Sequence, residues 1–252
     1  MNLIKNITCF RGADVIRIGI VEDEEIMQLK IHKCIKEILE EHELVEIRSY
    51  DCAEDFLNEV QKKVHFDILF SDIQMLEMNG IELGKRLQKD VPNLYIIYVT
   101  AYMEYAVESY KLSAYQYVLK EDVEMRLPQI ARKLLNQIQH EYAQFRIVGT
   151  NGIQKKIYLR DIIYAYKGKE TKYVYYVTTE GEYKERISLN EVWKFLEENG
   201  FLKIERAYLV NARHILKLEG NKLFLSDQSQ LTISRYRLKA VKLDIAKFWG
   251  GI

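Results

Sequence analysis

Short apolar runs alternate with amphipathic segments through the first half of the chain. The runs are rich in Ile, Val, Leu and aromatic residues and end in polar residues, as strands buried in a parallel sheet do. Between them, apolar residues recur at the spacing of a helix that packs one face on a core. The pattern predicts five strands, each followed by a helix, and so an α/β fold with a parallel sheet. The predicted strands are Ile16–Val21, Leu44–Tyr50, Phe66–Phe70, Leu94–Val99 and Tyr115–Leu119, and the predicted helices are Ile26–Leu39, Ala53–Lys62, Ile81–Lys89, Glu104–Leu112 and Val123–Tyr142.

The second half of the chain has a different period. Short strands separated by turns that contain Gly or Asn replace the long helical segments, which predicts a mostly β module. One predicted helix, Leu189–Asn199, follows Ser188 and carries Glu191 three residues later, the pattern of a capping box. A second helix, Arg235–Trp249, closes the chain. The predicted strands are Phe145–Val148, Ile153–Leu159, Ile162–Tyr166, Lys172–Thr178, Glu182–Ile187, Leu202–Glu205, Ala207–Val210, Ile215–Glu219 and Lys222–Leu225.

Composition agrees with two globular domains. The chain has 252 residues, of which 48% are hydrophobic and 29% charged, and a chain of this length usually forms two domains of ordinary size. No apolar stretch is long enough to span a bilayer, and residues 1–14 read as an irregular lead-in rather than a signal peptide. Three scattered cysteines, Cys9, Cys34 and Cys52, form no disulfide framework. We therefore expect a cytoplasmic protein with no membrane partner.

The net charge of zero hides two opposite halves. Residues 1–141 hold 17 Lys and Arg against 25 Asp and Glu, a net charge of −8, whereas the remainder holds 20 against 12, a net charge of +8. An acidic half suits metal ions and a basic half suits a polyanion, although ordinary variation in surface charge explains such a difference equally well.

Three acids follow predicted strands: Glu22 and Asp23 follow the first, and Asp72 follows the third. Because a parallel sheet gathers its site outside the carboxyl ends of its strands, these side chains should converge on one pocket. A divalent cation would neutralise their repulsion, and oxygen ligands suit Mg²⁺. A carboxylate beside such a cation is able to attack a phosphoryl group. Thr100 and Lys120 end the fourth and fifth strands, where a hydroxyl and an ammonium would reach the phosphoryl oxygens.

These residues resemble the receiver domain of two-component response regulators, a bacterial family. The resemblance covers roughly residues 15–125 and is carried by Glu22-Asp23, Asp72–Met75, Met78–Gly80, Thr100-Ala101 and Tyr117–Lys120. It implies a flavodoxin-like fold with a five-stranded parallel sheet, a receiver core over residues 15–125, and a final helix and linker over residues 126–143. It also implies residue roles: Asp72 as the phosphoacceptor, Lys120 as the partner of the phosphoryl group, Thr100 and Tyr117 as the switch pair, and Glu22, Asp23, Asp72 and the Gln74 backbone carbonyl as Mg²⁺ ligands.

Two positions depart from the family pattern. Leu76 and Glu121 stand where the family usually has proline. Without proline after it, Lys120 reaches the pocket either through a costlier cis bond or along another loop path. A receiver that folds without being phosphorylated stays open as an alternative.

The basic half resembles the LytTR DNA-binding domain over about residues 145–248, and we place that domain at 144–252. The resemblance rests on Phe201–Asn211 with Ile215, on the hairpin at Gly220-Asn221, on Ile233–Arg235, and on Ile157–Ile163 with Tyr166. It implies a largely antiparallel β fold whose loops enter successive major grooves of double-stranded DNA, while Asn211 is assigned to structure as a buried turn residue. The DNA contacts carried over by position are Lys172, Arg206 and Arg235, with Lys169 and Arg237 as phosphate contacts.

Three functions compete on this sequence. The leading one is a transcription regulator, not an enzyme, that a histidine kinase phosphorylates and that forms a homodimer on DNA after phosphorylation. A second is a phosphorylation-controlled relay whose output domain binds protein, against which the basic half counts. A third is a hydrolase, which would need a general base or second metal site that the sequence does not show.

Overall fold

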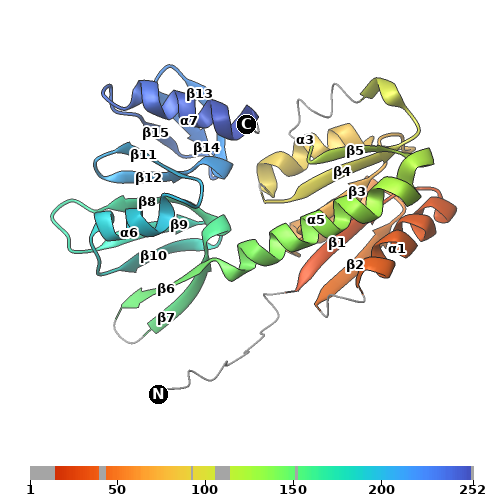
Figure 1. Cartoon of the computed structure of the whole chain (residues 1–252), viewed down its shortest axis with the longest axis horizontal. Helices are drawn as coiled ribbons and strands as arrows, with labels where there is room; N and C mark the ends of the chain where they lie inside the picture. The colour runs from red at the N-terminus through yellow and green to blue at the C-terminus, as the bar shows by residue number, and fades with distance from the viewer. Residues whose placement is uncertain (1–14, 40–43, 92, 106–113, 151–152, 251–252) are drawn as a thin grey trace. The chain divides into compact units, whose positions relative to one another are not determined.

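The structure, a computed structural model, describes residues 15–39, 44–91, 93–105, 114–150 and 153–250. The chain divides into two units, Met1–Gln139 and His140–Ile252 (Figure 1). The predicted lead-in at residues 1–14 lies outside the described residues. The fold class is confirmed: the first unit is α/β with a parallel sheet, and the second is mainly antiparallel β. Within the described residues, none of the helices combines the length and apolar character that a bilayer span requires.

A five-stranded parallel sheet forms the centre of the first unit, in the order β2-β1-β3-β4-β5. The three central strands, β1, β3 and β4, are almost wholly apolar and buried because helices cover both faces of the sheet, whereas the edge strands β2 and β5 are only partly buried. The chain leaves β1 toward β2 on one side and β3 lies on the other, which makes the ends of β1 and β3 the topological switch point. The strands are β1 Ile16–Val21, β2 Val45–Tyr50, β3 Ile68–Ser71, β4 Tyr95–Thr100 and β5 Gln116–Leu119.

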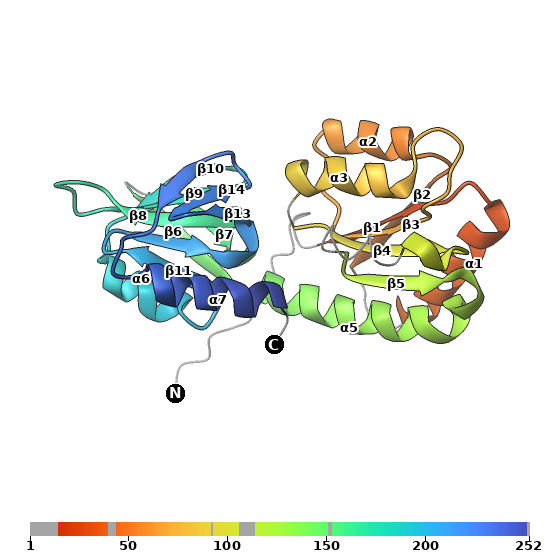
Figure 2. The same cartoon turned by 90° about the horizontal axis from the view of Figure 1, so that it is seen from above.

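The helices of this unit divide between the faces of the sheet. Figure 2 shows α2 and α3 on one face and α1 and α5 on the other. An ion pair between Lys30 Nζ of α1 and Glu124 Oε1 of α5, 3.5 Å long, agrees with that arrangement. The predicted helix Glu104–Leu112 is described only at its start, where the 3₁₀ helix η1 spans Met103–Tyr105, and residues 106–113 lie outside the described residues. The helices are α1 Glu25–Leu39, α2 Ala53–Gln61, α3 Gly80–Asp90 and α5 Val123–Ala143.

The described residues of the second unit form three antiparallel sheets. The largest has the order β10-β9-β8-β12-β11, and the others are β13-β14-β15 and the hairpin β6-β7. Alternating residues of the large sheet enter two cores: Leu209 joins α6 and the hairpin on one side, whereas Val210 joins α7 and the three-stranded sheet on the other. The strands are β6 Phe145–Thr150, β7 Ile153–Tyr158, β8 Ile162–Lys167, β9 Val174–Thr178, β10 Gly181–Glu185, β11 Phe201–Glu205, β12 Tyr208–Asn211, β13 Ile215–Glu219, β14 Lys222–Leu225 and β15 Gln230–Thr232.

Helices α6 and α7 of this unit differ from the predicted helices in where they begin or end. The capping box at Ser188 is confirmed, since its hydroxyl accepts from the Glu191 N–H and the Glu191 carboxylate accepts from the Ser188 N–H. Helix α6 spans Leu189–Leu196, shorter than predicted. Helix α7 spans Leu238–Gly250 and begins three residues later than predicted, because 235–237 form a turn instead.

Candidate functional site

Three carboxylates meet at the switch point of the parallel sheet. Glu22 and Asp23 follow β1, and Asp72 follows β3, whose pairing with β1 brings the two strand ends together. One carboxylate oxygen from each lies within 4.8 Å of the others. Glu22 is fully buried, Asp72 is 5% exposed and Asp23 is open to solvent. The predicted convergence of the acids is thus present, with one carboxylate at the mouth of the pocket and two inside it.

Lys120 neutralises part of this charge. Its Nζ lies 2.8 Å from Asp72 Oδ2, 2.9 Å from Glu22 Oε1 and 2.8 Å from Glu24 Oε1. Burial lowers the pKa of the Lys120 ammonium, but hydrogen bonds to Asp72, Glu24 and Glu22 outweigh it, and the net pKa is raised. Lys120 therefore stays charged inside the pocket.

The path of the chain at Lys120 needs no cis bond. No described peptide bond is cis, and Lys120 opens a 3₁₀ helix, η2 Lys120–Asp122, directly after β5. Of the two paths left open where Glu121 replaces proline, the structure thus shows the one with trans geometry. The ammonium reaches Asp72 all the same.

Two buried oxygens in this region have no hydrogen-bond partner among the described residues: Glu22 Oε2 and Thr100 Oγ1. An unpaired buried oxygen costs about 1–3 kcal/mol, so such atoms point to a ligand that completes their bonding. Burial is also the main reason that the pKa of Glu22 rises to about 7, against the lowering effect of its hydrogen bond from Lys120. An oxygen-lined, electron-rich pocket of this kind fits a hard divalent cation and a phosphoryl group.

Backbone groups hold the Asp72 carboxylate in place. Its Oδ1 accepts from the Ile73 N–H at 2.5 Å and from the Gln74 N–H at 3.2 Å, which leaves Oδ2 for Lys120. The loop returns over Asp72 at Gly80, whose N–H donates to the Ile73 carbonyl at 2.9 Å. A Cβ at Gly80 would collide with the Asp72 carbonyl oxygen, so this close approach requires glycine.

The predicted switch residues lie on neighbouring strands. Thr100 is fully buried at the end of β4, and Tyr117 on β5 is half-buried against the core. The Tyr117 hydroxyl donates to the Tyr102 carbonyl. Burial, followed by the charge of Glu104, raises the pKa of Tyr117 to about 12, so its hydroxyl remains a donor at neutral pH.

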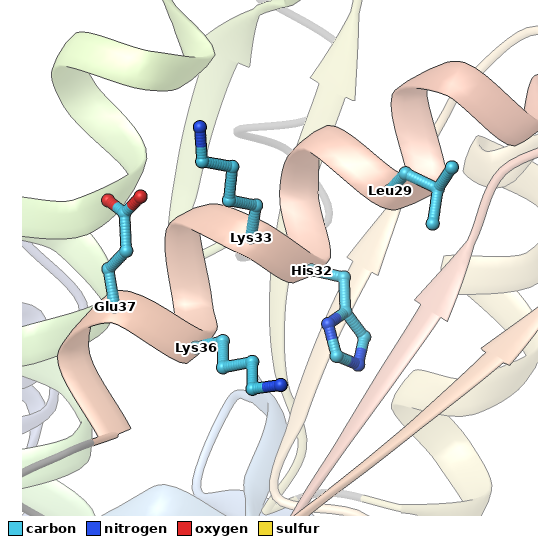
Figure 3. A pocket seen from close by; sticks show the side chains of 5 residues that line it. All are labelled: Leu29, His32, Lys33, Lys36 and Glu37. Atoms are coloured by element: carbon cyan, nitrogen blue, oxygen red, sulfur yellow. The ribbon is translucent and has the colours of Figure 1, made fainter.

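A shallow pocket also occurs on the surface of α1. Figure 3 shows its lining side chains, which all come from that one helix: Leu29, His32, Lys33, Lys36 and Glu37. None of the predicted site residues belongs to it. The acids of the switch point, not this pocket, therefore define the candidate site of the first unit.

In the second unit, the predicted DNA-contacting residues gather at one end of the large sheet. Lys169 and Lys172 lie in the loop between β8 and β9, and Arg206 lies in the turn between β11 and β12. The Lys167 N–H donates to the Ala207 carbonyl at 2.9 Å, which joins the two connections.

The segment before α7 reaches the same end of the sheet. Ser234 N–H donates to the Ile204 carbonyl of β11 at 3.2 Å, and this places Arg235 beside the β11–β12 turn. Lys169, Lys172, Arg206 and Arg235 are all exposed, and among the described residues none is hydrogen-bonded or ion-paired to their side chains. Four exposed cations at one end of a sheet are an arrangement suited to a polyanion.

Two polar residues of this unit have structural contacts. Arg237 is half-buried and its Nη1 donates to the Lys203 carbonyl at 3.2 Å, which ties the segment before α7 to β11. Asn211 is buried, as predicted; its Nδ2 donates to the Ile162 carbonyl at 3.0 Å and its Oδ1 accepts from the Arg213 N–H at 3.1 Å.

The sequence did not predict the roles of two residues of the acidic pocket. Glu24 pairs with Lys120, and the acidic run after β1 was the available signal. Gly80 appeared only as part of a motif, and nothing in the sequence indicated its contact with the Asp72 carbonyl.

Comparison with known proteins agrees with this division of the chain. The sequence model of the response regulator receiver domain matches residues 18–132, and that of the LytTr DNA-binding domain matches residues 154–245. The chain is 30% identical over 203 residues to an uncharacterized response regulatory protein of Vibrio cholerae, covering 67% of this chain and 76% of that protein. It is 28% identical over 168 residues to the transcriptional regulatory protein LytR of Staphylococcus aureus, covering 61% and 68%. The solved response regulatory domain of protein mrkE from Klebsiella pneumoniae is 28% identical, with a TM-score of 0.44 over 50% of this chain and 99% of that one.

Proposed function

The chain belongs to the response regulators that join a receiver domain to a LytTR DNA-binding domain, and from this premise we propose that phosphorylation of Asp72 controls how its basic loops bind DNA. A receiver implies a histidine kinase as the phosphoryl source, and a LytTR domain implies DNA as the target. The single observation that carries the proposal is Lys120 Nζ at 2.8 Å from Asp72 Oδ2, in a pocket where Glu22 Oε2 and Thr100 Oγ1 are buried without partners among the described residues.

Each residue of the pocket has a role in that reaction. Asp72 Oδ2 attacks phosphorus, the bond from phosphorus to the donor breaks, and the donor leaves with a proton. Lys120 then moves its ion pair from the carboxylate to the new phosphoryl oxygens. The Ile73 and Gln74 N–H groups keep Oδ1 fixed meanwhile, so that Oδ2 is the oxygen that reacts.

Mg²⁺ fits this donor set. Glu22, Asp23, Asp72 and the Gln74 backbone carbonyl would hold it, and Glu22 Oε2 is already buried without a partner among the described residues. When bound, Mg²⁺ neutralises the charge of carboxylate and phosphoryl oxygens as they approach each other.

Thr100 and Tyr117 transmit the change. The Thr100 hydroxyl, which has no hydrogen-bond partner among the described residues, is drawn to the phosphoryl oxygens, and the Tyr117 ring then leaves its bond to the Tyr102 carbonyl and turns inward. The altered surface favours a homodimer, which places two output domains on paired DNA sites.

The first test is phosphorylation of the purified full chain by a small acyl-phosphate donor with Mg²⁺, followed by intact mass. The wild type should gain one phosphoryl group, and Asp72→Asn should gain none. Equal labelling of Asp72→Asn would overturn the assignment. Glu77→Gln, an exposed acid of the neighbouring loop, serves as the matched control and should label normally.

The second test addresses the basic loops. Single substitution of Lys172, Arg206 or Arg235 by Ala should weaken DNA binding in a gel shift and reduce the preference for a selected duplex over an unselected one. Lys194→Ala, an exposed cation on α6, should change neither quantity. Lys169→Ala should weaken binding equally for all sequences and lower the salt slope by about one ion, as loss of a phosphate contact does. Arg237→Ala should do the same and, because it also removes the bond to the Lys203 carbonyl, should in addition displace Arg235. DNA binding that changes neither with salt concentration nor with these substitutions would favour the alternative in which the output domain binds a protein.

A further inference from the structure

Three tyrosine rings form a stack across three strands of the output domain. Tyr175 on β9 lies opposite Tyr166 on β8, which lies opposite Tyr208 on β12. The ring centroids are 5.1 Å apart with a 16° interplanar angle in the first pair and 5.7 Å apart with 14° in the second. Such stacking adds about 0.5–1.5 kcal/mol per pair beyond the burial of area. We call these three rings the tyrosine ladder.

Each ring of the ladder adjoins a basic connection. Tyr166 is the penultimate residue of β8, before the loop 168–173, and Tyr175 is the second residue of β9, after it. Tyr208 begins β12, immediately after the turn 206–207. The ladder therefore runs from the loop that carries Lys172 to the turn that carries Arg206.

The loop 168–173 rests directly on the ladder. A Cβ at Gly168 would lie 2.8 Å from Cε2 of the Tyr175 ring and 2.7 Å from Thr171 Oγ1, so a side chain at this position would force one of these neighbours to shift. The Thr171 hydroxyl accepts from the Tyr173 N–H at 3.4 Å within the loop. The Tyr175 ring thus restricts the position of the first residue of this loop.

The middle ring has one polar contact in addition to the stacking. The Tyr166 hydroxyl donates to Glu182 Oε2 of β10 at 3.0 Å. Burial, with this carboxylate, raises the pKa of Tyr166 to about 12, so the hydroxyl keeps its proton at neutral pH.

We propose that the tyrosine ladder is a positioning device that sets the distance between the loop 168–173 and the turn 206–207, so that Lys172 and Arg206 meet DNA in one register. The ladder itself touches no DNA. The proposal rests on the proposed DNA-binding function and adds to it the source of its sequence selectivity. Attraction to phosphates tolerates a shifted loop because it depends on charge alone, whereas contact with base edges does not.

The test uses two DNA probes: a duplex selected by the wild-type protein from a random-sequence pool, and an unselected duplex of the same length. Tyr166→Leu removes the middle ring. It should lower the ratio of the two affinities by about tenfold, comparable to the loss of one base contact, while binding to unselected DNA and its salt slope stay unchanged. Tyr175→Leu removes an outer ring and should do the same, which keeps the test valid if Tyr166→Leu does not fold.

Two controls separate stacking from stability. Tyr166→Phe keeps the ring and should retain the wild-type ratio within about twofold, a difference worth ~0.4 kcal/mol. Tyr183→Leu alters the opposite face of the same sheet, where Tyr183 pairs with Tyr176, and should leave the ratio unchanged. An unchanged ratio in both Tyr166→Leu and Tyr175→Leu, or an equal loss in Tyr183→Leu, would overturn the proposal. Failure of the wild type to select any sequence would instead overturn the proposed function.

Discussion

The acidic pocket of the receiver and the core of the output domain both bury polar groups but treat them in opposite ways. In the pocket, Glu22 Oε2 and Thr100 Oγ1 lack partners among the described residues. In the output domain, His214 is fully buried with both ring nitrogens bonded, Nδ1 to Ser226 Oγ and Nε2 to the Arg160 carbonyl, each at 2.8 Å. Asn211 is satisfied in the same way.

The difference teaches which buried polar groups are functional. A satisfied group such as His214 fixes one packing of its neighbours, and its removal lowers stability. An unsatisfied group lowers stability as it stands, and beside a cluster of acids such a group points to a ligand that completes its bonding. The receiver pocket, with its unpaired oxygens beside clustered acids, is therefore a candidate ligand site. His214 and Asn211 have their hydrogen bonds satisfied within the protein and are structural.

The largest expected effect concerns His214 and pH. The Arg160 carbonyl only accepts, so Nε2 carries the proton and Nδ1 accepts from Ser226 in the neutral ring. Burial lowers the pKa of His214 to about 4. Between about pH 6.5 and pH 4 the unfolded chain binds the proton and the folded chain does not, so stability should fall by about 3 kcal/mol as the pH falls through this window.

The measurement is urea unfolding followed by tryptophan fluorescence. Both tryptophans, Trp193 and Trp249, lie in the second unit, so the signal reports that unit alone. His214→Gln should remove this part of the pH dependence while other carboxylates still contribute theirs. Parallel pH profiles for wild type and variant would show that His214 is not buried as a neutral ring.

The next effect concerns the loop over Asp72. Gly80→Ala places a methyl group against the Asp72 carbonyl, and overpacking of this kind costs about 1–3 kcal/mol. It should also displace Asp72 and slow phosphorylation by on the order of tenfold or more. Phosphorylation by the small acyl-phosphate donor, timed by intact mass, measures the second effect.

The output domain supplies a matched glycine. Gly220 has φ of +60°, and a Cβ added there would meet no atom within 4 Å, so Gly220→Ala costs backbone strain of about 1 kcal/mol and no collision. It should leave phosphorylation unchanged. Equal rates for Gly80→Ala and wild type would mean that the loop yields without moving Asp72.

Local patterns predicted most of the fold and the residues of the pocket. Buried parallel strands appear in the sequence as apolar runs, and the position of Asp72 after one such run was enough to place it near Glu22, because parallel strands end at one edge. The capping box at Ser188 was predictable for the same reason: its partner lies three residues away.

Features fixed by distant residues were not predictable. Helix α7 begins at Leu238 rather than Arg235 because the preceding turn is tied back to Lys203 and Ile204 of β11, about 30 residues earlier in the chain. Strand β15, Gln230–Thr232, contains a single apolar residue, too little for a strand pattern to appear in the sequence, and its pairing with β14 defines it. The tyrosine ladder likewise depends on strand register, which the positions of the tyrosines in the sequence do not reveal.

A smaller expected effect is that Mg²⁺ stabilises the receiver unit and leaves the stability of the second unit unchanged. If Glu22, Asp23 and Asp72 hold Mg²⁺, free Mg²⁺ at about ten times its Kd should stabilise the receiver by ~1.4 kcal/mol. Hydrogen exchange should slow in peptides from β1 and β3 and stay unchanged in peptides from β8 and β12. Glu22→Gln should lose most of this protection. Equal slowing in both units would point to a general salt effect instead of a site.

The smallest expected effect comes from the exposed partner of Lys120. Glu24 and Asp72 lie at the same 2.8 Å from Lys120 Nζ, but the Glu24 side chain is 67% exposed whereas that of Asp72 is 5% exposed. Solvent screens an exposed ion pair, so Glu24→Gln should cost less than about 1 kcal/mol and change the phosphorylation rate by no more than about twofold. Glu22→Gln, which alters a fully buried partner of the same ammonium, provides the contrast and should slow phosphorylation far more. Distance alone would predict equal effects for the two variants; the structure predicts unequal ones, because burial sets the strength of each ion pair. A tenfold slowing in Glu24→Gln would therefore show that this surface carboxylate, and not only the buried pair, holds Lys120 in its reactive position.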